Sequence, residues 1–204
     1  MAGRDVTLVA GQYYHLYNRG NNRQPIFFER ENYLHFLRQV RKYLLPVMDV
    51  VAYCLMPTHY HILVRTKDEA LVVAETHQGL DRTDAMYATA MMRFGVAYTK
   101  AINKRYGRVG RLFQGQYQAR LVDRDAYLLH LSRYIHLNPV ASDLVTRPEE
   151  WEFSSYAEYV GARSGSLPMP GIVVAQIGGA NEYRQFVDSL GLKQDEKILH
   201  LVIE

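Results

Sequence analysis

The alternation of hydrophobic and polar positions along the chain predicts four strands and three main helices. Short apolar segments of strand length span residues 11–19, 47–56, 59–66 and 116–122. Apolar residues at helical spacing mark residues 29–45, 83–106 and 125–137. Pro46 and Pro139 follow the first and the last of these helices. We expect both helices to stop there, because proline lacks the backbone N–H that continues a helix.

The order of these elements predicts the fold class. Four strands, with helices after the first and third, are typical of an α+β fold with a ferredoxin-like split βαβ antiparallel sheet and helices on its faces. Two shorter helices are expected at residues 68–78 and 181–190. Composition changes after Pro139, so we expect a first domain at residues 1–146 and a C-terminal acidic extension at residues 147–204 that packs on it.

Composition narrows the class of protein. The chain has 204 residues, of which 48% are hydrophobic and 22% charged, enough to bury a core. No apolar run reaches 18 residues, so no membrane span is expected, and the N-terminus lacks the apolar region of a secretory signal. A single cysteine, Cys54, excludes an internal disulfide and a cysteine-based zinc site. A cytoplasmic protein is therefore expected.

The charge is distributed unevenly, and this points to a polyanionic partner. Residues 1–142 carry 19 basic and 11 acidic side chains, a net charge of +8, whereas residues 143–204 carry a net charge of −5. Seven basic residues and one acidic residue lie in residues 100–124. Aromatic and amide residues are interleaved with them, a mixture that suits single-stranded nucleic acid, where bases stack on rings and the backbone follows cations. The ordinary alternative is that these charged residues form the solvated face of a helix and bind no nucleic acid.

Two histidines form the first candidate site. His59 and His61 alternate on a predicted strand, so both side chains lie on one face, and Tyr60 points into the layer beneath. Two imidazoles on a rigid face can share a metal ion. The motif alone is short, and surface histidines or histidines with a structural role explain it as well.

A helix farther along the chain carries a second pair. Tyr134 and Asn138 are four residues apart, so they lie on one face of a helix. Asn138 offers a neutral oxygen to a metal ion, and Tyr134 a hydroxyl that can attack an electrophile held there. The alternative is that Tyr134 packs on the sheet and Asn138 caps the helix.

Five segments in this order carry a resemblance to a known family. They are YNRGNNRQPIFF (17–28), AYCLMPTHYHILV (52–64), GRLFQG (110–115), RYIHLNPV (133–140) and WEFSSY (151–156). In them the chain resembles the REP-associated tyrosine transposases, a branch of the HUH single-strand DNA transposases. The resemblance covers about three quarters of the chain and fades after Gly161.

The resemblance implies roles for the candidate residues. His59 and His61 match the metal ligands of the HUH motif, although Tyr60 is bulkier and more polar than the usual middle residue. Tyr134 matches the catalytic tyrosine, and Asn138 the third metal ligand. His130, one turn before Tyr134, is a possible proton acceptor or a structural residue. Residues 1–146 would then be an HUH-type catalytic domain that processes single-stranded DNA.

The implied activity is that of a metal-dependent single-stranded DNA endonuclease and strand transferase, acting at palindromic hairpins through a 5′-phosphotyrosine intermediate. The resemblance implies Mg²⁺ or Mn²⁺ as the cofactor, whereas imidazole ligands by themselves favour zinc, copper or nickel. The implied partner is single-stranded or hairpin DNA. The implied setting is the cytoplasm, in association with the nucleoid, as a monomer or a homodimer.

Three regions are candidates for binding DNA. The turn at residues 18–23, the end of the third strand and the basic segment at residues 104–120 combine cations with amide or aromatic side chains. The candidates are Asn18, Arg19, Arg23, Arg65, Lys104, Arg105, Tyr106, Arg108, Arg111, Phe113 and Arg120.

Three other interpretations remain open from the sequence. A metal-dependent hydrolase would use His59, His61 and a water nucleophile, leaving Tyr134 dispensable. A hairpin-binding protein adopted by its host would have lost cleavage. In the third, the acidic tail covers the basic groove and is held by Trp151 and Tyr156, although packing is the ordinary role of these two residues.

Overall fold

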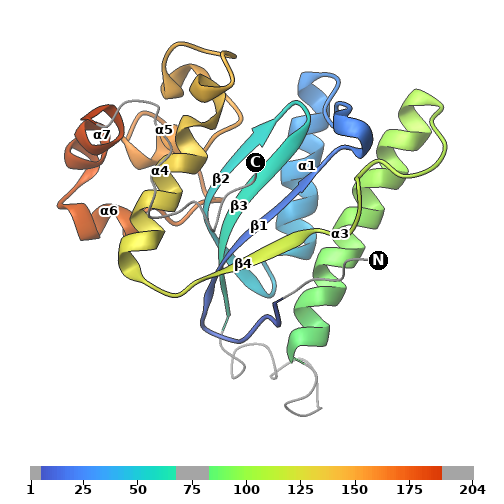
Figure 1. The fold of residues 1–204 in the computed structure, drawn as a ribbon, viewed down its shortest axis with the longest axis horizontal. Helices are drawn as coiled ribbons and strands as arrows, with labels where there is room; N and C mark the ends of the chain where they lie inside the picture. Colours follow the sequence, from blue (N-terminus) through green and yellow to red (C-terminus); the bar gives the residue numbers. More distant parts are fainter. Residues whose placement is uncertain (1–5, 68–82, 190–204) are drawn as a thin grey trace.

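A computed structural model describes residues 6–67 and 83–189 and contains a four-stranded sheet (Figure 1). The strands are β1 (Tyr13–Arg19), β2 (Met48–Met56), β3 (His59–Thr66) and β4 (Gln118–Val122), in the spatial order β2-β3-β1-β4. Each neighbouring pair is antiparallel. β3 lies between β1 and β2, which α1 connects, and this is the split βαβ arrangement predicted from the sequence.

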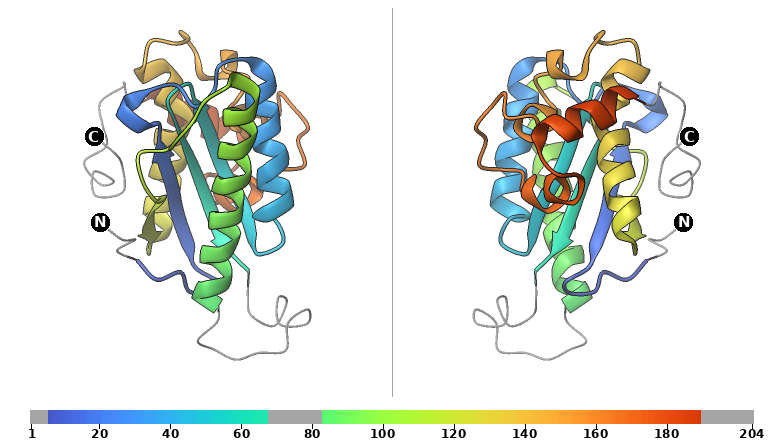
Figure 2. Two further views of the ribbon diagram at one scale, coloured as in Figure 1. Left: turned by 90° about the vertical axis from the view of Figure 1, so that its right-hand side faces the viewer. Right: turned by 90° about the vertical axis from the view of Figure 1, so that its left-hand side faces the viewer.

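Helices cover both faces of the sheet, as the edge-on views of Figure 2 show. α1 (Arg30–Tyr43) and α3 (Thr83–Tyr106) lie on one face, and α4 (Asp125–Ala141) lies on the other. Beyond α4 come α5 (Tyr156–Tyr159), α6 (Gly171–Ile177) and α7 (Ala180–Ser189). Two 3₁₀ turns, η1 (Asn21–Arg23) and η4 (Pro148–Glu150), complete the described elements. The fold is therefore the predicted α+β class.

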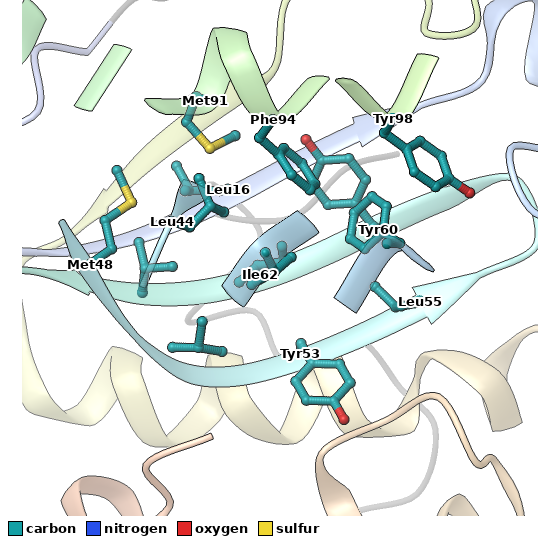
Figure 3. Close-up of a cluster of buried hydrophobic side chains, with 14 of the residues drawn as sticks. Leu16, Leu44, Met48, Tyr53, Leu55, Tyr60, Ile62, Met91, Phe94 and Tyr98 are labelled. Atoms are coloured by element: carbon teal, nitrogen blue, oxygen red, sulfur yellow. The ribbon is translucent and has the colours of Figure 1, made fainter. Parts of the chain in front are cut away.

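Alternation along β3 divides its side chains between two cores. Tyr60 and Ile62 are buried with Phe94 and Tyr98 on the α1 and α3 side (Figure 3). Leu63 is buried on the α4 side. Successive side chains of a strand point to opposite faces, so His59 and His61 lie on the α4 side with Leu63. The predicted orientation of Tyr60 into the opposite layer is confirmed, since only 2% of its surface is exposed.

The prediction that Pro139 ends its helix is wrong, because α4 continues to Ala141. Proline removes one helical hydrogen bond, the one its N–H would donate to the carbonyl four residues earlier. The next turn is still closed, because the Ser142 N–H donates to the Asn138 carbonyl oxygen over 3.0 Å. Asn138 is therefore inside the helix rather than its cap. Pro46 agrees with the prediction, since α1 ends at Tyr43.

Other boundaries differ by a few residues. β1 begins at Tyr13 because Gly11 has a positive φ of 73°, which strand geometry does not allow. β4 begins at Gln118 because the preceding loop turns away to pair with the end of β1, through a bridge between Gly20 and Phe113. The short helix expected at residues 68–78 lies outside the described residues.

The extension after residue 146 covers the outer edge of β2. The Leu55 N–H donates to the Phe153 carbonyl over 2.9 Å, and the Met169 N–H donates to the Val50 carbonyl over 2.8 Å. α6, a helix the sequence did not predict, contributes Val173 to the core shared with α4. The described part of the extension thus completes the sheet edge and the second core.

Trp151 serves this packing. Its Nε1 donates to the Leu55 carbonyl over 3.0 Å, and its ring meets Tyr33 and Phe153 edge to face. Up to Ser189 the extension wraps around the β2 edge, with α6 and α7 on the α4 side (Figure 1) and Phe153 and Leu167 in the core on the α1 side. Within the described ranges it therefore leaves the basic loop uncovered, and residues 190–204 lie outside them. None of the described helices is long and apolar enough to cross a membrane.

Candidate active site and nucleic-acid interface

The two histidines of β3 lie side by side below α4. The ring centroids of His59 and His61 are 5.0 Å apart and the rings are nearly perpendicular, at 87°. The Nδ1 atom of His59 is 3.0 Å from the Thr58 hydroxyl. Only 1% of the His61 surface is exposed, whereas His59 is partly exposed. The strand therefore holds His61 inside the protein and leaves His59 partly accessible.

Helix α4 brings Tyr134 and Asn138 to this pair. Leu131 and Ile135 anchor the helix on the sheet, and this sets Tyr134 beside His61. The ring centroids of Tyr134 and His61 are 5.5 Å apart, in an edge-to-face contact at 83°. Tyr134 is half-buried. The structure thus brings the predicted nucleophile and one predicted metal ligand into direct contact within a single chain.

The side-chain amide of Asn138 is held in one orientation. Its Nδ2 donates to the Tyr134 carbonyl oxygen over 2.9 Å, one helical turn earlier. Its side chain also hydrogen-bonds the His59 ring. Since the amide nitrogen is committed to Tyr134, the oxygen is the atom left to face the histidine pair. The three predicted ligands His59, His61 and Asn138 therefore meet at one place, on two elements far apart in the sequence.

Burial keeps both imidazoles neutral near neutral pH. It lowers the pKa of His59, and the hydrogen bond with Asn138 opposes this while the charge of Arg19 adds to it. It lowers the pKa of His61 well below its usual value, and the neighbouring His59 and His15 lower it further. Neutral imidazole is the form that binds a metal ion.

The donor set fits a divalent cation. Two neutral imidazoles and an amide oxygen bring no charge of their own, so a cation held there keeps its attraction for a phosphate. No group of three His, Cys, Asp or Glu side chains gathers in residues 6–67 and 83–189 as a metal site. The predicted site has only two side chains of these four types, His59 and His61, because its third donor is the amide of Asn138.

The predicted DNA-binding turn and loop form one surface. The Asn21 N–H donates to the Leu112 carbonyl, and the Gln114 N–H to the Arg19 carbonyl, each over 2.9 Å. Arg19 pairs in register with His59 across the sheet. We call residues 18–24 and 107–116 the turn–loop surface. It adjoins the histidine pair, at the end of the sheet where β3 begins.

Several side chains that were predicted to contact DNA already have partners within the protein. The Asn18 Nδ2 donates to the Gly115 carbonyl over 3.1 Å, and the Arg19 guanidinium bonds the Gln114 side chain. Arg105, at the end of α3, forms an ion pair with Glu29 at 2.5 Å. The Asn18 and Arg19 contacts hold the turn–loop surface together, and the Arg105 ion pair joins the end of α3 to the start of α1. Arg23, Lys104 and Arg111 are exposed and remain predicted phosphate contacts.

The predicted stacking rings also have partners inside the protein. Phe113 packs on Tyr60 and Tyr98 at 6.0 and 6.3 Å between centroids. Tyr106 packs on Phe28 at 4.6 Å and donates its hydroxyl hydrogen to Asn32 over 3.0 Å. Their predicted contacts with bases are untested, and the rings support the fold.

Phe28 is the ring that the sequence did not single out. It remains 41% exposed, and the Arg108 guanidinium lies 5.5 Å from its centroid. An exposed ring paired with an arginine is a common platform for a base. The sequence does show two adjacent phenylalanines, Phe27 and Phe28. Only the tertiary structure shows which of the two rings is exposed.

Two arginines lie farther along the sheet. Arg65 shares the face of the histidine pair but follows His61 by four residues, about 13 Å along a strand. Arg120 pairs in register with His15 on β4 and is exposed on the same face. His130 packs against Phe186 of α7 at 5.4 Å, and its role as a proton acceptor stays a prediction.

Comparison with known proteins identifies the fold. No family model and no curated protein matches the sequence. The structure is similar to that of a REP-associated tyrosine transposase bound to a REP hairpin, with a TM-score of 0.54 and 14% identity over 83% of this chain and 98% of that chain. The chain has the fold of a REP-associated tyrosine transposase. A candidate transposase from Deinococcus radiodurans R1 also matches, with a TM-score of 0.34 and 18% identity over 66% of this chain and 95% of that chain.

One buried residue of this transposase fold was missed from the sequence. His15 of β1 is fully buried, and its Nε2 lies 2.9 Å from the Nδ1 of His61. Alternation along β1 places His15, Tyr17 and Arg19 on one face. The pairing of β1 with β3, which brings that face to the histidine pair, was not visible from spacing alone.

Proposed function

We propose that this protein is a metal-dependent single-stranded DNA endonuclease and strand transferase that acts at hairpin DNA through a 5′-phosphotyrosine intermediate. The contact of Tyr134 with His61, next to His59 and Asn138, carries the proposal. The fold supports it, because the similar transposase structure holds a REP hairpin. The protein would act on DNA in the cytoplasm and would associate with the nucleoid.

The chain's own residues account for the chemistry as follows. The turn–loop surface binds the DNA backbone, and the site at the start of β3 receives the scissile phosphate. The Tyr134 hydroxyl gives up its proton to solvent and its oxygen attacks phosphorus, the bond from phosphorus to the 3′ oxygen breaks, and that oxygen takes a proton from solvent and leaves as a hydroxyl, so no net proton is gained or lost. When bound, Mg²⁺ or Mn²⁺ supplies Lewis-acid stabilisation of the charge on the phosphate. His59, His61 and the Asn138 oxygen would hold the cation.

A covalent tyrosine link explains how the protein can rejoin strands. The phosphodiester energy is kept in the phosphotyrosine, so a second 3′-hydroxyl can attack it and restore a DNA strand without ATP. Water as the nucleophile would lose this capacity. Since Tyr134 and His61 belong to one chain and are in contact, a monomer suffices for the first step.

Labelled single-stranded DNA with a palindrome, incubated with Mn²⁺ and run on a denaturing gel, tests the proposal. We expect label to travel with the wild-type protein. Replacement Tyr134→Phe should abolish this adduct, a loss of at least about a hundredfold, and leave hairpin binding intact. Tyr127→Phe, two turns earlier on α4, is the matched control and should keep the adduct.

Three results would contradict the proposal. An adduct that persists in Tyr134→Phe would mean another nucleophile. Cleavage by the wild type with no covalent species would indicate a hydrolase that uses water. Tight hairpin binding by the wild type, with neither adduct nor cleavage, would indicate a binding protein adopted by its host.

A further inference from the structure

His15 is a fully buried imidazole in contact with the candidate metal site. Its Nε2 atom lies 2.9 Å from His61 Nδ1, and the two ring planes are inclined by only 21° with their centroids 5.1 Å apart. Tyr17 covers it at 4.9 Å between centroids. None of the surface of His15 is accessible to solvent. A polar ring buried so completely needs a hydrogen-bond partner, and on this side of the ring the partner is His61.

This hydrogen bond has two possible directions, with different consequences for His61. If His15 donates, His61 Nδ1 accepts and the proton of the neutral His61 ring lies on Nε2, which then has no lone pair for a metal ion. If His61 Nδ1 donates its proton to His15 Nε2, the His61 Nε2 lone pair is available. Nδ1 is committed in both cases, so a cation can reach His61 only through Nε2.

We propose that His15 is a positioning residue that accepts the His61 Nδ1–H and thereby holds the His61 Nε2 lone pair toward a divalent cation. This inference rests on the proposed function, because it takes His61 to be a metal ligand. His15 itself touches neither the cation nor the DNA. Partners of this kind fix the tautomer and the orientation of a ligating histidine, and their loss costs about 10–100-fold in metal affinity.

Replacements of His15 that differ in length and in hydrogen-bonding ability test its hydrogen bond with His61. Glutamine places an amide oxygen near the position of Nε2, whereas asparagine is shorter and does not reach it, and phenylalanine keeps the ring shape without an acceptor. The three variants are His15→Gln, His15→Asn and His15→Phe. His35→Phe is the matched control, since His35 is a half-buried histidine on α1, against Tyr98 on the other side of the sheet.

The readout is the affinity for Mn²⁺ alone, measured from the electron paramagnetic resonance signal of the free ion, without DNA. We expect His15→Phe and His15→Asn to weaken Mn²⁺ binding about 10–100-fold, and His15→Gln to stay within about threefold of the wild type. Hairpin affinity in EDTA should be unchanged in all three, and His35→Phe should bind Mn²⁺ like the wild type.

Equal Mn²⁺ affinity in His15→Asn and His15→Gln would overturn the inference, as would wild-type affinity in a folded His15→Phe. If His15→Phe does not fold, the comparison of the two amides decides. The variant His59→Ala gives the Mn²⁺ affinity expected when the site is lost. A wild type that binds Mn²⁺ no better than this variant would also overturn the inference. Normal Mn²⁺ binding with no DNA adduct would contradict the proposed function and leave the role of His15 standing.

Discussion

His136 shows how one residue of α4, the helix that carries Tyr134, is joined to the extension. It is fully buried, with Nδ1 2.7 Å from the Tyr183 hydroxyl and Nε2 2.8 Å from the Ser155 hydroxyl. Burial lowers its pKa to about 3. The Tyr183 hydroxyl in turn lies 3.0 Å from the Ser132 hydroxyl. Helix α4 therefore takes its position from polar contacts on its outer side as well as from apolar contacts with the sheet.

This buried histidine predicts acid sensitivity. Its pKa is about 3 in the folded protein and near 6.5 in the unfolded chain, so the unfolded chain binds the proton first. Its contribution to stability is complete above pH 6.5 and is lost as the pH falls from there toward 3, by more than about 1 kcal/mol per pH unit. Urea unfolding between about pH 7 and pH 5 should give a shallower slope for His136→Gln than for the wild type. Equal slopes would contradict this.

The turn at Gly20 is the element that connects the histidine pair to the predicted DNA surface. The Gly20 N–H donates to the Thr58 carbonyl over 2.7 Å, and the Gly20 carbonyl accepts from the Arg23 N–H over 3.0 Å. A Cβ atom at Gly20 would lie 1.9 Å from the Gln24 carbonyl oxygen. The turn therefore requires glycine for the close approach of its own backbone, and not for an unusual φ, which is −63°.

Alanine at this position should open the turn. We expect Gly20→Ala to lower the free energy of unfolding by about 1–3 kcal/mol and to weaken hairpin binding, because the clash is with backbone and cannot relax through a side chain. Gly95→Ala is the control: nothing lies within 4 Å of its added Cβ, and α3 should gain about 0.5–1 kcal/mol. Thermal unfolding and hairpin titration measure both. A Gly20→Ala variant with wild-type stability and affinity would refute the steric argument.

Charge is separated across the whole molecule. The basic turn–loop surface lies at the end of the sheet beside the site, whereas the described part of the acidic extension packs on the β2 edge and the outer side of α4. Glu152 of the extension pairs with Arg30 at the start of α1. This arrangement leaves the exposed cations Arg23, Lys104 and Arg111 available to a polyanion.

The salt dependence of hairpin binding should distinguish exposed cations from paired ones. Arg111→Gln should reduce the slope of log affinity against log salt by about one, because a phosphate contact releases a counterion. Arg105→Gln should change it less, since Glu29 already neutralises Arg105. Hairpin titrations over a series of salt concentrations measure both slopes. A larger change for Arg105→Gln, or none for Arg111→Gln, would place the DNA elsewhere.

Local pattern was enough for the elements and for most of the candidate residues. The spacing of apolar side chains predicted all four strands and both α1 and α3, because periodicity records which side of an element is buried. It also placed His59 with His61, and Tyr134 with Asn138. It failed at Pro139, where the helix loses one hydrogen bond and continues, and at α6, where glycines and prolines nearby concealed a short apolar helix.

Only the tertiary structure brings these two pairs of residues together. His59 and Tyr134 lie on β3 and α4, and only the packing of α4 across the sheet brings them together, which no local spacing encodes. The strand order likewise decides that His15 of β1 lies beside His61, and the packing around Tyr60 decides that Phe113 faces the interior while Phe28 faces solvent. Periodicity assigns a face to each side chain, but the partner on that face is chosen by the long-range pairing of strands and helices.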